Sequence, residues 1–103
     1  MKIIEILSDK IAEEIHDAGE YARMALEYRE QYPDLAKTLH DLSGEEMDHM
    51  RRLHAAAAEI IEKYRAEKGE PPAAMMAVYD YLHKKQITSA AEVKTLQDMF
   101  MGK

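Results

Sequence analysis

The chain has 103 residues, which is a natural length for one domain, and it contains no cysteine. The lack of cysteine excludes disulfides, thiolate zinc sites and iron–sulfur ligation. There are 14 lysines and arginines against 20 aspartates and glutamates, a net charge of −6 with no basic stretch, so we expect no nucleic-acid partner.

The first predicted element is a helix over residues 3–31. Its apolar positions recur in steps of three and four, a heptad-like stripe that one charged residue, Glu14, interrupts. The stripe consists of Ile4, Leu7, Ile11, Glu14, Ala18, Tyr21, Ala25 and Tyr28. Pro33 predicts the end of this helix, because the residue before a proline avoids the α conformation. The short turn at 32–34 predicts that the next helix returns antiparallel to the first.

The second predicted helix covers residues 34–67 and carries a similar stripe, interrupted by Glu46 and His49. This stripe consists of Leu35, Leu39, Leu42, Glu46, His49, Leu53, Ala56, Ile60 and Tyr64. Residues 1–68 are therefore predicted to form a long helical hairpin. A glycine and two prolines follow, which is a typical stop signal.

Two shorter helices are predicted after this stop, at about 72–86 and 89–100. The division rests on Ser89 and Glu92, which have the spacing of a capping box. Residues 69–103 are interpreted as an extension of the same domain that serves packing or oligomerisation. With no strand signal anywhere, the predicted fold class is all-α.

The three interrupting residues are predicted to meet. Glu46 and His49 are three residues apart and project from one helix face. Glu14 precedes Glu46 by 32 residues, so a hairpin that closes near residue 30 places both glutamates at the same height. Burying lone charges is costly. A metal ion held by oxygen and nitrogen ligands would offset them; the alternative is a metal-free polar network that fixes the helix register.

These three residues form only half of a known type of site. Di-iron carboxylate bundles use one glutamate from each of two helices and a Glu-x-x-His pair from each of the other two. This chain supplies one of each. Two copies would complete a four-helix bundle with two metal ions, so we expect a homodimer or a higher homo-oligomer.

The pattern of Glu14, Tyr21 and Glu46-Met47-Asp48-His49 resembles the first half of ferritins, bacterioferritins and rubrerythrins. The stretch from Pro33 to His49 is especially similar to the encapsulated ferritins, and the resemblance spans about residues 4–67. It implies a ferroxidase centre formed between two subunits, at which two Fe(II) ions react with dioxygen or peroxide and become Fe(III).

The same resemblance implies the role of each residue. Glu46 would bridge both ions, Glu14 and His49 would each bind one ion, and Tyr21 would be a hydrogen-bonding group behind the ligands. It also implies an encapsulating shell protein as a partner, although residues 97–103 do not resemble the usual targeting tail. Without cysteines, an electron relay of the rubrerythrin type is not expected.

Several alternatives stay open. Glu20 is the second choice for the role of Glu14. Manganese could replace iron, and the same ligands would suit a di-iron or di-manganese oxidase or peroxidase acting on a small substrate. A metal-free dimeric module whose residues 72–100 bind a partner is a different class of function. The chain has neither a membrane-span pattern nor a signal-peptide pattern, so we expect a cytoplasmic protein, either free or held inside a protein compartment.

Overall fold

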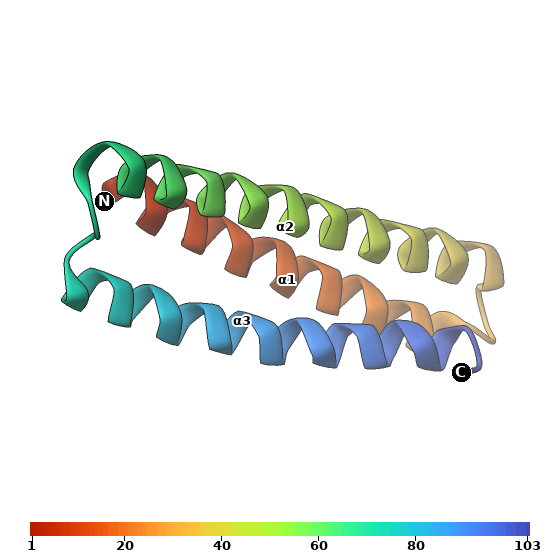
Figure 1. Ribbon diagram of the computed structural model, residues 1–103. Coiled ribbons are helices and arrows are strands. Elements are labelled where there is room, and N and C mark those ends of the chain that lie inside the picture. Colours follow the sequence, from red (N-terminus) through yellow and green to blue (C-terminus); the bar gives the residue numbers. More distant parts are fainter.

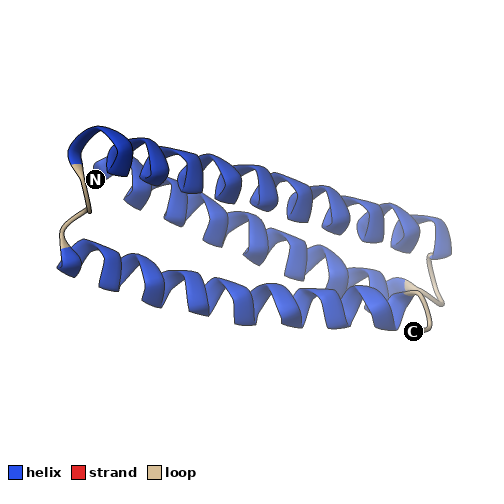
Figure 2. Ribbon diagram, in the orientation of Figure 1, coloured by secondary structure: helices blue, strands red, loops and turns tan.

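Three long helices make up nearly the whole chain. A computed structural model describes residues 1–103, with α1 at Lys2–Tyr28, α2 at Pro33–Lys68 and α3 at Ala73–Phe100. They lie side by side in an elongated bundle of 55 × 21 × 18 Å, joined by short loops (Figures 1 and 2). The predicted all-α fold class is confirmed, and α1 and α2 form the predicted antiparallel hairpin. None of the helices is both long enough and apolar enough to span a bilayer.

The ends of α2 follow from prolines and a glycine. Pro33 lies in the first turn, where the missing N–H group needs no partner. Gly69 ends the helix with a φ of 82°, a conformation that favours glycine, and its N–H donates to the carbonyl of Arg65. Pro71 and Pro72 then turn the chain into α3.

The prediction of two short C-terminal helices is wrong, because residues 73–100 form one continuous helix. Ser89 and Glu92 have capping-box spacing but lie within α3. No proline or glycine breaks the segment, and β-branched residues cost a helix less than about 1 kcal/mol each. The hydroxyl of Thr88 donates to the carbonyl of Lys84, so it is satisfied inside the helix. The capping-box spacing therefore did not start a new helix, because no proline or glycine before it ended the preceding one.

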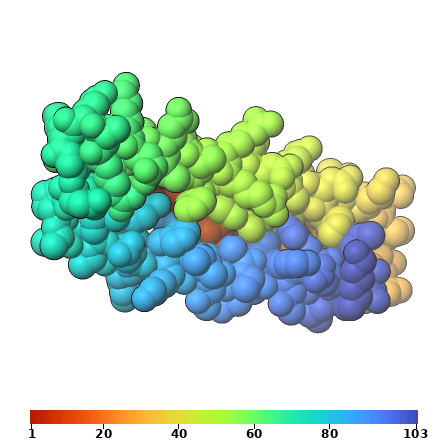
Figure 3. Space-filling model, in the orientation of Figure 1, coloured from red at the N-terminus to blue at the C-terminus, as the bar shows by residue number.

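The helix α1 packs against both other helices, whereas α2 and α3 barely touch. Part of α1 is visible between them in the space-filling view (Figure 3). The main buried cluster consists of Ile11, Ile15, Ala18, Met47 and Val93, and a second one consists of Ile4, Ala57 and Ile61. The buried face of α1 is therefore centred between α2 and α3, which leaves Leu7, Glu14 and Tyr21 of the predicted stripe only partly buried.

Polar and aromatic contacts supplement the apolar packing of α3, in which Val93 is the one buried residue. Two glutamines of α3 hydrogen bond to buried serines of the hairpin. Aromatic rings join α3 to α2: His40 stacks on Phe100 with ring centroids 4.5 Å apart, and His54 stacks on His83 at 4.6 Å.

From the stacked histidines we predict that acid lowers the free energy of unfolding through the contact between α2 and α3. Burial, and then the neighbouring charge of His83, lower the pKa of His54 from its usual 6.5. The unfolded chain therefore binds a proton more readily, and this stabilisation is lost as the pH falls below about 6.5. In urea denaturation of the metal-free protein at pH of about 7.5 and 5.5, the wild type should lose more free energy of unfolding than His54→Gln. Equal losses in the two proteins would contradict the prediction.

Candidate metal centre

The structure brings Glu14, Glu46 and His49 together. Glu14 projects from α1, and the other two project from adjacent turns of α2. Their candidate ligand atoms all lie within 4.8 Å of one another. The Nδ1 atom of His49 is 3.5 Å from Oε2 of Glu14 and 3.8 Å from Oε1 of Glu46. The hairpin thus places both glutamates at one height, as their spacing in the sequence predicts.

The cluster lies on the side of the hairpin away from α3. Gly19 marks the side of α1 that faces α3, since a Cβ atom there would be 3.5 Å from Val93. At 100° per residue, Glu14 lies about 140° around the axis of α1 from Gly19. The Glu14 and Glu46 side chains are 24% and 21% exposed, whereas that of His49 is 52% exposed. The two carboxylates are mostly buried, and the imidazole faces outward.

The two carboxylates strongly affect each other. The pKa of Glu46 is raised to about 7, first by hydrogen bonding with Glu14, then by burial and by the negative charge of Glu14. The charge of His49 acts in the opposite direction. Near neutral pH the metal-free pair therefore shares a proton, as expected for two carboxyl groups in one site.

The donor set fits a divalent cation. Two carboxylates and an imidazole suit Fe²⁺, Mn²⁺ or Zn²⁺. When Glu46 carries no proton, Oε2 of Glu14 is buried without a hydrogen-bond partner, although buried polar atoms normally have one. A cation bound between the carboxylates would satisfy this oxygen and replace the proton on Glu46.

The other predicted residues lie near the cluster or away from it. Tyr21 is partly buried, two turns along α1 from Glu14, and no hydrogen bond within the chain involves its hydroxyl; its role stays a prediction. Glu20 is exposed and accepts a hydrogen bond from Arg23 at 2.8 Å, which lowers its pKa. The structure therefore brings Glu14, and not Glu20, to the cluster.

Sequence reasoning did not identify Asp17 as part of this region. Asp17 is exposed and follows Glu14 by three residues on α1, and its charge contributes to the raised pKa of Glu46. Its position one turn from a proposed ligand was the available signal. It adds negative potential at the exposed side of the cluster, which favours the arrival of cations.

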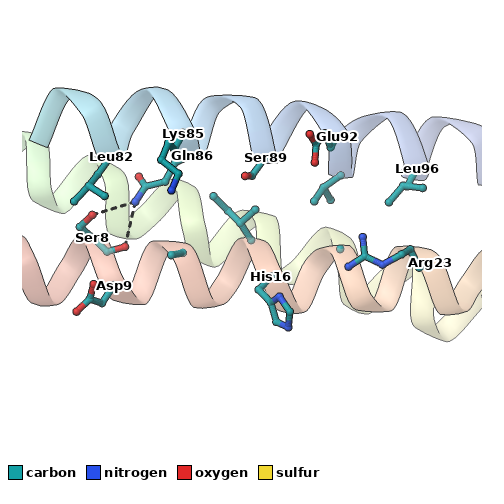
Figure 4. Close-up of a pocket in the computed structure, with 14 residues that line it drawn as sticks. Ser8, Asp9, His16, Arg23, Leu82, Lys85, Gln86, Ser89, Glu92 and Leu96 are labelled. Carbon is teal, nitrogen blue, oxygen red and sulfur yellow. Dashed lines mark hydrogen bonds between the residues drawn. The ribbon is translucent and has the colours of Figure 1, made fainter. Parts of the chain in front are cut away.

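One cavity lies elsewhere, between α1 and α3. It has a volume of about 330 Å³, and none of its lining residues belongs to the cluster. Figure 4 shows Gln86 reaching from α3 to Ser8 across one part of this groove, while His16 points away from α3. We assign the candidate chemistry to the glutamate–histidine cluster alone.

The shared proton predicts how the pH affects the metal-free protein. The pKa of Glu46 rises from its usual 4.5 to about 7 on folding. The resulting stabilisation is complete below pH 4.5 and is lost as the pH rises through about 7. The wild type should therefore lose more free energy of unfolding than Glu46→Gln between pH of about 5 and 8, measured by urea denaturation. Parallel pH profiles would show that Glu46 does not titrate in this way.

Comparison with known proteins gave one family. The family model described as Rubrerythrin matches residues 5–99. The match extends the predicted resemblance, which ended at residue 67, through most of α3. No curated protein and no solved structure matched the chain.

Proposed function

The chain belongs to the rubrerythrin family, and from this premise we propose that it is a ferritin-like iron-binding protein with ferroxidase activity. In this proposal two Fe(II) ions bind between two subunits and are oxidised to Fe(III). The observation that carries it is the meeting of Glu14, Glu46 and His49 on one half-buried face of the hairpin. Members of this superfamily build di-iron centres from the same residue types.

The proposal requires a second copy of the chain. One chain offers two carboxylates and one imidazole, whereas a di-iron centre of this type uses four carboxylates and two imidazoles. A two-fold axis through the cluster would supply the missing half. Glu46 from each chain would then bridge the ions, and Glu14 and His49 would each bind one ion.

The surface around the cluster supports this pairing. Several large apolar side chains lie within about 80° of Glu14 or Glu46 around their own helix axes. They are Ile3, Ile6, Met24, Leu35, Leu42, Leu53 and Ile60, of which Ile3, Ile6, Met24 and Leu35 are between 37% and 46% exposed. Exposed apolar side chains gathered around buried charged groups are typical of an interface.

In the proposed reaction, the protein binds and orients the two Fe(II) substrate ions. Each Fe(II) gives up one electron, and dioxygen or peroxide accepts the pair together with two protons. Glu46 releases its shared proton when the metal binds, so binding should strengthen as the pH rises through about 7. The apolar face of the second chain would exclude water from the carboxylates.

Metal content tests the centre directly. We expect about one Fe(II) or Co(II) ion per chain by anaerobic titration, because two ions are shared by two chains. Glu46→Ala and His49→Ala should remove this binding and the oxygen-dependent formation of Fe(III). Glu20→Ala is the matched control and should retain both. A wild type that binds no metal, or loss of binding in Glu20→Ala but not in Glu14→Ala, would overturn the assignment.

Assembly tests the interface. Ile60→Glu places a charge on the proposed dimer face and should shift the protein toward monomer in analytical ultracentrifugation. Tyr81→Glu is the control, because Tyr81 is 63% exposed on α3, away from this face. Metal should strengthen the dimer of the wild type, since binding to the complete site stabilises the associated state. A metal-loaded wild type that stays monomeric at high concentration would contradict the half-site.

Two alternatives are separated by the same experiments. A metal-free dimeric module is favoured by the raised pKa of Glu46, since a shared proton can satisfy the carboxylate pair without an ion. An oxidase or peroxidase with iron or manganese would need space for its substrate. The cavities of about 260, 270 and 330 Å³ include no residue of the cluster, so they provide no such space beside it.

A further inference from the structure

We propose that Ser43 is a positioning residue for the metal centre, acting through a buried hydrogen-bond relay that joins all three helices. The inference rests on the proposed function and adds to it a role for α3. Through the relay, α3 sets the height of α1 against α2, and so the height of Glu14 against Glu46.

The relay consists of two short hydrogen bonds. The hydroxyl of Ser43 on α2 donates to the backbone carbonyl of Ala18 on α1 at 2.7 Å. The same hydroxyl oxygen accepts a hydrogen bond from Nε2 of Gln97 on α3 at 2.9 Å. Ser43 is 0% exposed, so no water competes with either bond. A buried hydroxyl with both partners in place has a strongly preferred position.

The relay lies one helical turn from each glutamate of the cluster. Ser43 precedes Glu46 by three residues, and Ala18 follows Glu14 by four. A slip of one residue between α1 and α2 would displace the two glutamates by about 1.5 Å and rotate one of them by about 100°. Such a slip would separate the ligand atoms that now lie within 4.8 Å of one another.

On one side of the relay, apolar packing specifies this register weakly. From Ala18 toward the turn, the contact surface of α1 consists of small residues, Ala18, Ala22 and Ala25, whereas the larger Ile15 and Met47 pack on the other side of the relay. Small side chains allow close helix approach but interlock little, so this half of the contact distinguishes little between neighbouring registers. A directional hydrogen bond to one particular carbonyl distinguishes between them.

A second serine–glutamine contact provides a matched control. Nε2 of Gln86 donates to the carbonyl and the hydroxyl of Ser8 at 3.1 Å each, as Figure 4 shows. Ser8 is also buried, at 7% exposure. This contact joins α3 to α1 only and does not link the two helices that carry the ligands. Like the relay, it pairs a glutamine of α3 with a buried serine, but it lies outside the contact between α1 and α2.

The test compares Ser43→Ala with Ser8→Ala in the full chain. Both should lower the urea midpoint, because each removes a buried hydrogen bond of α3. Only Ser43→Ala should weaken Co(II) binding, by about tenfold, and change the visible absorption of bound Co(II), which reports ligand geometry. If Ser43→Ala matches Ser8→Ala in Co(II) affinity and in spectrum, the role of Ser43 is merely structural and the proposal is overturned.

Two further measurements cover the other outcomes. If Ser43→Ala fails to fold, Gln97→Ala should weaken Co(II) binding at least threefold relative to Gln86→Ala, and equal affinities would overturn the proposal.

If the wild type binds no Co(II), the proposed function fails. The relay is then judged by NMR contacts between α1 and α2 in the metal-free proteins. Ser43→Ala should lose the contacts between the turns of Glu14 and Glu46, and unchanged contacts would overturn the relay.

Discussion

Two carboxyl groups that face each other across a helix pair are the constraint on which this structure depends. Ionising both Glu14 and Glu46 is unfavourable without an offsetting charge, and the raised pKa of Glu46, about 7, reflects that repulsion together with burial. A proton or a cation can resolve it. Sharing a proton or binding a cation requires the two side chains at one height. The turn at Pro33 and the register of α1 against α2 therefore matter for the site.

The position of α3 decides how the site meets its surroundings. It packs on the side of the hairpin where Val93 joins Ile15 and Met47. The opposite side, which carries the cluster, stays open and partly apolar. If α3 covered that side instead, a second chain could not complete a di-iron centre. With α3 on one face of the hairpin, the other face is the one left open to the proposed second copy.

The match to the rubrerythrin family includes all three helices. The family model covers residues 5–99, so α3 belongs to the matched domain together with the hairpin. The chain has no cysteines, so it offers no thiolate ligand for iron. The carboxylate and imidazole groups of α1 and α2 are the part of the chain suited to metal chemistry.

The sequence by itself determined the hairpin and the meeting of Glu14, Glu46 and His49. Helical periodicity and the stop at Pro33 are local signals. Together with the spacing of 32 residues, they place the two glutamates at one height of the hairpin. Only the tertiary structure decided that Ser89 and Glu92 lie inside one long helix, and that α3 packs against the face of α1 away from Glu14. It also decided the partial burial of the cluster, the shared proton and the relay through Ser43. These features arise from contacts between segments far apart in the chain, which no local pattern of residues encodes.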